Sequence, residues 1–180
     1  MKQQQKIARA GRALRWGLVV LSLVAAGALV LGTPLLHAAT HTAEITITAN
    51  KTANGGFAFN GYQRGAMTIT VPAGWQVLVR FENADTTNHS LAVLASGAHT
   101  QVAPPSSPAF AGATTPNFAA GSAKGQQLTF TFEASKPGTY ELVCGVPGHA
   151  ISGQWDALVV SATATEPSVT PSGAATITVK

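Results

Sequence analysis

Residues 67–83 read MTITVPAGWQVLVRFEN and contain two alternating runs joined by a short turn. The apolar residues at every second position are Met67, Ile69, Val71, Trp75, Val77, Val79 and Phe81. Strict alternation of apolar and mostly polar residues is typical of a strand with one buried face. The intervening Pro-Ala-Gly at 72–74 is typical of a turn. The stretch therefore predicts two half-buried strands.

The same period of two continues through most of the chain beyond residue 40. It recurs in segments 45–47, 89–93, 128–132, 140–144 and 157–159. No long helical pattern appears in this part of the sequence. About seven or eight short strands in about 120 residues predict an antiparallel β-sandwich or barrel.

The N-terminus differs sharply from the rest in composition. Five basic residues fall within the first fifteen positions, and the uncharged run WGLVVLSLVAAGALVLGTPLL follows at 16–36. A basic start followed by an apolar run is typical of a signal peptide or a signal anchor, and about 20 apolar residues can span a bilayer. We expect one signal or transmembrane helix in residues 1–38, and an extracytoplasmic location for the rest. The protein is then held at the outer face of the membrane, or secreted if the helix is cleaved.

The remainder divides into a domain at 39–161 and a Thr/Pro-rich tail at 162–180, with an irregular Pro/Ala/Gly/Ser/Thr-rich insertion at 97–125. The final ATITVK of the tail could add a strand, or the tail could be disordered. Of the 11 Lys and Arg residues, 5 precede residue 16, which leaves 6 against 7 Asp and Glu in the domain and tail. A basic nucleic-acid footprint on the folded part is therefore excluded.

The segment CGVPGHAISGQW at 144–155 carries the most chemical information. Cys144 is the only cysteine, which excludes an internal disulfide and a four-cysteine metal site. His149 follows it by five residues just past a strand end, and His89 opens an earlier strand. The alternation places His89 and Cys144 on core-facing sides. Two histidines and one thiolate form the trigonal ligand set of a blue copper centre, which has a weak axial fourth ligand.

Other functions fit these residues less well. A multicopper oxidase needs many histidines, and a binuclear purple copper site needs a second cysteine. A Cys–His hydrolase would need an activated thiolate, and no helix N-terminus is predicted beside Cys144. The sequence therefore predicts a protein that is not an enzyme. A copper chaperone or storage protein and a metal-free adhesion module remain as alternatives.

Two stretches resemble the cupredoxins, specifically the sulfocyanin branch, with rusticyanin as a more distant relative. They are NGYQRGAMTITVPAGWQVLVRFENADTTNHS at 60–90 and KPGTYELVCGVPGHAISGQW at 136–155, and the resemblance extends over residues 43–161. It implies a Greek-key β-sandwich with one type 1 copper ion that cycles between Cu(I) and Cu(II), bound by His89, Cys144 and His149. It also implies single-electron transfer between extracytoplasmic respiratory partners, such as a membrane cytochrome complex or a terminal oxidase.

One position departs from the family pattern. The family usually has methionine five residues after the loop histidine, where this chain has Gln154. We expect Gln154 to be the axial ligand and, because its carbonyl oxygen is a harder donor than a thioether, to lower the reduction potential. The alternative is that Gln154 points away and the copper is three-coordinate.

Residues around the ligands have expected supporting roles. Asn88, Ser90 and Pro147 are expected to orient the loops and to tune the sulfur. Val146, Ala150 and Ile151 are expected to form an apolar docking patch around His149.

Overall fold

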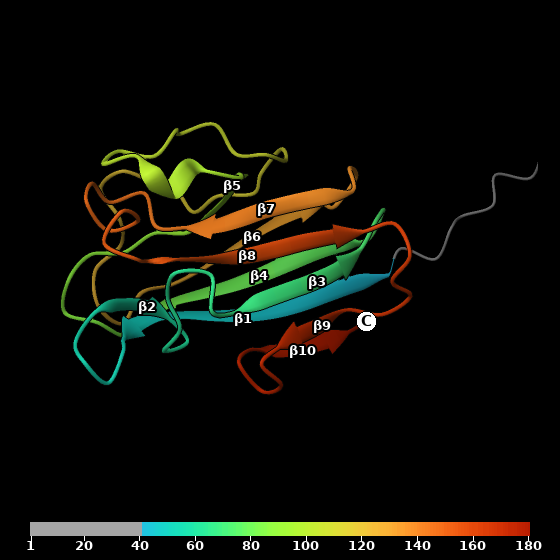
Figure 1. The fold of residues 1–180 in the computed structure, drawn as a ribbon, viewed down its shortest axis with the longest axis horizontal. Coiled ribbons are helices and arrows are strands. Elements are labelled where there is room, and N and C mark those ends of the chain that lie inside the picture. Colours follow the sequence, from blue (N-terminus) through green and yellow to red (C-terminus); the bar gives the residue numbers. More distant parts are fainter. Residues whose placement is uncertain (1–40) are drawn as a thin grey trace, which may run out of the picture. The chain divides into compact units, whose positions relative to one another are not determined.

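The computed structural model describes residues 41–180 (Figure 1). The predicted signal or transmembrane helix, residues 1–38, lies outside the described residues. Within residues 41–180 no helix is long and apolar enough to cross a membrane. The regular elements are β1 (Thr42–Lys51), β2 (Phe57–Phe59), β3 (Thr68–Pro72), β4 (Gln76–Asn83), β5 (Ala92–Ala95), the 3₁₀ helix η1 (Ala98–Thr100), β6 (Gln127–Glu133), β7 (Gly138–Val143), β8 (Trp155–Ser161), β9 (Ser168–Thr170) and β10 (Thr176–Val179).

The strands form two sheets that enclose one hydrophobic core, so the predicted all-β sandwich is confirmed. One sheet has the order β10-β1-β4-β6 with β2 also paired to β1, and the other has the order β5-β7-β8-β3-β9. The alternation is the physical origin of the core. The buried residues of β1 and β4 are Ala43, Ile45, Ile47, Ala49, Val77, Val79, Phe81 and Asn83. The polar residues between them face outward.

The strand directions differ from the expectation of a wholly antiparallel sandwich. β1 runs parallel to β4, and β3 runs parallel to β8. A parallel pair needs a crossover connection between its strands. The chain supplies one after β1, because β3 lies in the opposite sheet before β4 returns to the first.

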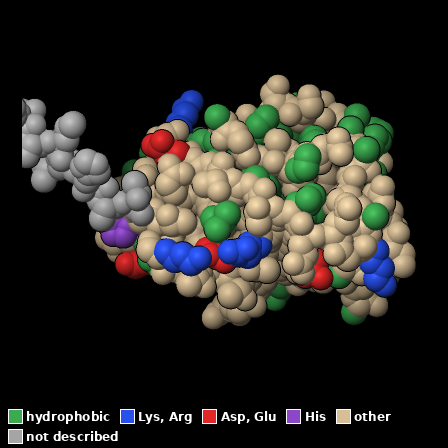
Figure 2. Space-filling view, turned by 180° about the vertical axis from the view of Figure 1, so that it is seen from behind, with side chains coloured by type: hydrophobic (Ala, Val, Ile, Leu, Met, Phe, Trp, Pro, Cys, Tyr) green, Lys and Arg blue, Asp and Glu red, His purple; other side chains and the backbone are tan. Residues whose placement is uncertain are grey.

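The C-terminal residues continue the sheets beyond residue 161. β9 pairs with β3, and β10 pairs with β1 in the register Ala43↔Val179. Of the two alternatives for the tail, the structure therefore shows the one in which the last residues add a strand. Glu44 on β1 forms ion pairs with Arg80 on β4 and with Lys180. Figure 2 shows few charged side chains on one face of the domain, in keeping with the 10% of charged residues in the chain.

The segment 97–125 lies against the edge of the second sheet, beside β5 (Figure 1). Val93 exchanges backbone hydrogen bonds with this segment, donating to Ala113 and accepting from Ala109. Ser122 forms an isolated antiparallel bridge with His89. The segment therefore covers a sheet edge and reaches the end of the domain that carries His89.

Candidate metal centre

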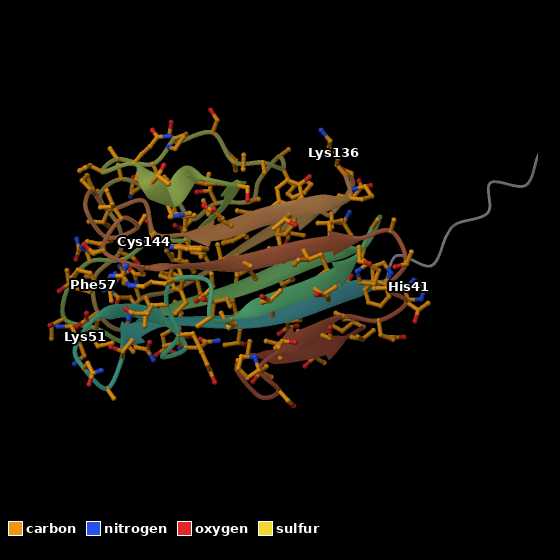
Figure 3. All side chains as sticks on the ribbon, in the orientation of Figure 1. His41, Lys51, Phe57, Lys136 and Cys144 are labelled. Carbon is orange, nitrogen blue, oxygen red and sulfur yellow. The ribbon has the colours of Figure 1, made fainter. Side chains whose placement is uncertain are left out.

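The three predicted metal ligands converge at one end of the sandwich. Cys144 directly follows β7, His149 lies in the loop between β7 and β8, and His89 lies between β4 and β5. All three are buried, and their potential ligand atoms lie within 4.8 Å of one another. Figure 3 shows Cys144 at this end of the domain and His41 at the opposite end.

The separations between the donor atoms fit a trigonal metal site. The Nδ1 atoms of His89 and His149 lie 3.2 Å apart, and the Cys144 Sγ lies 3.9 Å and 3.6 Å from them, respectively. With metal–nitrogen bonds of about 2.0 Å and metal–sulfur bonds of about 2.3 Å, a planar trigonal site requires about 3.5 Å between nitrogens and about 3.7 Å from nitrogen to sulfur. The observed triangle is close to these values, so a metal ion can be held with little movement of the side chains.

Gln154 is fully buried and points its carbonyl oxygen into the same site. Its Nε2 donates a hydrogen bond to the backbone carbonyl of Ala58 at 3.2 Å. This orients Oε1 toward the His89 Nδ1, which lies 2.8 Å away. The other nitrogen of His89, Nε2, faces the Asp85 carboxylate at 3.1 Å. When the His89 proton is on Nε2, the lone pair of His89 Nδ1 is free. This lone pair, the Gln154 oxygen and the Cys144 sulfur then face one point, where a cation would interact with all three.

The Cys144 sulfur lies against Ser90, the residue that follows His89. The backbone N–H of Ser90 points at the Cys144 Sγ at 3.4 Å, and the Ser90 hydroxyl lies 3.8 Å from it. The same hydroxyl accepts a hydrogen bond from the Gly145 N–H at 2.9 Å. Burial raises the pKa of the Cys144 thiol. Coordination to a metal would remove that proton, so the buried thiol is suited to holding a metal rather than to free thiolate chemistry.

His149 is held as a neutral imidazole by its surroundings. Burial, followed by the proximity of His89, lowers the pKa of His149. A neutral ring leaves a nitrogen lone pair available for metal binding. Phe57 on β2 stacks on the His149 ring with 4.2 Å between ring centroids and meets the His89 ring edge-on at 5.2 Å. Sequence analysis missed Phe57, because its alternation with Phe59 indicates only a short strand.

The residues expected to support the site lie in different environments. Ser90 contacts the sulfur, as described above. Asn88 is exposed, and its amide donates to the Ala120 carbonyl at 3.2 Å, so it ties its loop to the 97–125 segment. Pro147 is exposed in the loop between Cys144 and His149.

The expected docking patch needs one correction. Ile151 is 47% exposed and Val146 is half-buried, but Ala150 is fully buried and cannot take part in a surface patch. Its side chain packs in a small cluster with Phe118 and Val143. In its place the structure brings Val102, which is 61% exposed and accepts the Gly148 N–H at 2.7 Å.

The 97–125 segment also contacts the backbone on which the proposed ligands lie. Ser122 accepts the His89 N–H at 3.2 Å and donates its own N–H to the His89 carbonyl at 2.7 Å. The Phe118 ring covers Gly145 so closely that a Cβ built at Gly145 would lie 2.5 Å from it. This segment, which has almost no regular secondary structure, therefore holds the backbone beside two of the three ligands.

Comparison with known proteins agrees with this geometry. Residues 33–170 match the family model described as "Sulfocyanin (SoxE) domain". A sulfocyanin of Sulfolobus acidocaldarius is 35% identical over 133 residues, covering 70% of this chain and 67% of that protein. A structure of reduced rusticyanin superposes with a TM-score of 0.53 at 26% identity, covering 67% of this chain and 79% of that one.

Proposed function

Because the chain belongs to the sulfocyanin family of cupredoxins, we propose that it carries single electrons through one copper ion bound by His89, Cys144 and His149. The family consists of electron carriers and not of enzymes, and it implies a copper cofactor. The observation that carries the proposal is the triangle of two imidazole nitrogens and one thiol sulfur, which fits a trigonal site.

The chain supports electron transfer by holding its donor atoms nearly fixed. Copper at this position supplies a one-electron couple between Cu(II) and Cu(I). The ligands are restricted in movement by the two sheets, by the paired backbone hydrogen bonds between Ser122 and His89, and by the Phe57 ring stacked on His149. Burial of the ligands excludes water from the sulfur. A site that changes little between oxidation states needs little reorganisation, so electron exchange is fast.

We further propose that Gln154 would help to hold the copper as its weak axial ligand. Its anchored amide leaves the carbonyl oxygen as the atom presented to the site. A carbonyl oxygen is a harder donor than the methionine sulfur usual in the family, and it favours Cu(II). The axial ligand is one of the main controls on the potential of such centres.

Redox partners are proposed to dock where the His149 end of the domain meets solvent. The exposed or half-exposed apolar residues there are Val102, Val146 and Ile151. Small contacts of this kind are typical of transient redox encounters. The partners would be respiratory proteins, such as a membrane cytochrome complex or a terminal oxidase.

We place the domain at the extracytoplasmic face of the cell membrane, held by the segment at 1–38 or released by cleavage. The described chain begins at His41, at the opposite end of the domain from Cys144 (Figure 3).

The test is visible absorption and electron paramagnetic resonance of the purified full chain after addition of Cu(II). An intense thiolate-to-copper band is expected in the wild type, absent in Cys144→Ser and retained in His41→Ala, which removes a histidine from the opposite end. A colourless protein without tightly held copper would overturn the proposal and favour the metal-free adhesion module. Rapid loss of copper to a chelator would instead favour a chaperone or storage protein.

A further inference from the structure

The Asp85 carboxylate contacts the His89 imidazole on the side away from the metal site. Its Oδ2 lies 3.1 Å from the His89 Nε2. Its Oδ1 accepts the Thr86 N–H at 2.6 Å, and the Asp85 N–H donates to the Asn83 side chain at 2.9 Å. The side chain is only 7% exposed, so this carboxylate is held in place and poorly screened by water.

A single cation faces this carboxylate in the part of the chain that the structure describes. The Lys51 ammonium lies 3.8 Å from the Asp85 Oδ1 and is 44% exposed. It also lies 5.8 Å from the centre of the Phe57 ring, the ring that stacks on His149. Figure 3 shows Lys51, Phe57 and Cys144 at the same end of the domain. The buried carboxylate of Asp85 thus contacts one proposed ligand, and the half-exposed ammonium of Lys51 lies next to that carboxylate.

Other buried acidic side chains make different contacts. Glu141 accepts hydrogen bonds from Gly97 and His99, and Asp156 accepts one from Met67. Among the acidic residues of 41–180, Asp85 is the one hydrogen-bonded to a proposed ligand.

We propose that Asp85 is a positioning residue that keeps the His89 proton on Nε2 and lowers the reduction potential of the copper, and that Lys51 offsets part of this effect. The proposal rests on the proposed function. A carboxylate partner on the outer nitrogen fixes the tautomer and the ring orientation of a metal-binding histidine and raises its basicity. The hydrogen bond therefore leaves Nδ1 as the nitrogen that faces the metal.

The sign of the effect on the potential follows from charge. The oxidised centre carries one more positive charge than the reduced centre. A nearby anion therefore stabilises the oxidised form, and a nearby cation destabilises it. Asp85 and Lys51 consequently shift the potential in opposite directions, whereas two residues with a purely structural role would have no reason to do so.

The decisive variant is Asp85→Asn, which keeps an oxygen acceptor for the His89 Nε2–H but removes the charge. We expect it to bind copper with the intense band preserved and to have a higher potential. Acting across the His89 imidazole ring, the unit charge of Asp85 favours the oxidised form about tenfold, which is about 59 mV for a one-electron couple. Asp85→Ala, which also removes the acceptor, should in addition bind copper more weakly and broaden the paramagnetic resonance signal.

Lys51→Gln provides an independent test at a half-exposed position. It should lower the potential, and the shift should shrink at high salt because the ammonium is accessible to counterions. Glu133→Gln is the control for Asp85→Asn, because it also removes one negative charge. Glu133 is exposed at the end of β6, where it pairs with Gln76, and its replacement should leave the potential unchanged.

The outcomes separate this inference from the proposed function. A blue Asp85→Asn protein with an unchanged potential would overturn the role of Asp85 while leaving the copper site intact. If Asp85→Asn fails to fold, an unchanged potential in Lys51→Gln would equally overturn the inference. A wild-type chain without the intense band would instead refute the proposed function itself.

Discussion

The buried carboxyl group of Asp156 on β8 is expected to make the domain more stable in acid than at neutral pH. Its side chain is fully buried. Oδ1 accepts the Met67 N–H at 2.9 Å, and Oδ2 has no hydrogen-bond partner among the described residues. Burial raises the pKa of Asp156 from 3.8 to about 7, although the Met67 hydrogen bond acts in the opposite direction.

The sign follows from proton linkage. Between the ordinary pKa and the raised one, the folded chain binds more protons at Asp156 than the unfolded chain does, so the free energy of unfolding falls as pH rises through this range. The interval from 3.8 to about 7 is about three pH units, or about 4 kcal/mol at about 1.36 kcal/mol per unit. The stabilisation is complete below about pH 4 and lost above about pH 7.

Asp156→Asn retains an acceptor for the Met67 N–H and cannot ionise. We expect its free energy of unfolding to lack this decline, so that relative to the wild type it gains about 4 kcal/mol between pH 4 and pH 8. The measurement is chemical denaturation of the metal-free proteins at several pH values. Taking the difference between the two proteins cancels other titrating groups, such as His149 and Glu44.

Two results would refute the reasoning. One is a difference between the two proteins that does not change with pH. The other is a difference that changes in the opposite direction.

Glu44 provides a contrasting case, because hydrogen bonds from Arg80 and Lys180 lower its pKa to about 2. Its stabilising effect is present above its ordinary pKa of 4.5 and is lost as pH falls toward 2, so Glu44→Gln should weaken the domain near neutral pH but not near pH 2.

Four further substitutions test the metal centre and its surroundings, the fourth as a compensating change for the third. Gln154→Met should raise the reduction potential measured by redox titration, and an unchanged or lower value would refute axial tuning by Gln154. Ser90→Ala should lower the reduction potential, because the Cys144 sulfur loses its hydroxyl neighbour. It should also lower the free energy of unfolding by about 1–3 kcal/mol, because the buried Gly145 N–H loses its acceptor. A variant as stable as the wild type would contradict the second expectation. Gly145→Ala should destabilise the domain by about 1–3 kcal/mol through its clash with the Phe118 ring, and Phe118→Leu should recover part of the loss. Failure of the second substitution to help would show that the clash lies elsewhere.

Local sequence pattern was sufficient to predict most of the strands and the three residues that the structure brings together as possible metal ligands. Alternation along a strand reports directly which side chains face the core, because successive side chains point to opposite faces. The alternation at 89–93 and 140–144 therefore placed His89 and Cys144 in the interior, where the structure shows them. The spacing of Cys144 and His149 is also local, since both lie in one loop.

Strand direction and the surroundings of the site were decided only by the tertiary structure. The parallel pairs depend on which sheet a strand joins after a turn, and alternation carries no information about that. Ala150 is buried in a cluster that includes Phe118 and Val143, and the loop sequence does not indicate either of these residues.

The same limit applies to the partners of the ligands. Phe57 and Lys51 come from the β1–β2 hairpin, more than thirty positions before His89, and Val102 comes from the irregular segment. Even Asp85, four residues before His89, lies on no repeating pattern that would mark it as the imidazole's partner. The sequence by itself determined most of the strands, the core faces and the residues positioned to hold a metal, because these depend on the chemistry and spacing of near neighbours. The folded chain decided which charges and rings surround them, because contacts between distant segments depend on how the two sheets cross and pack.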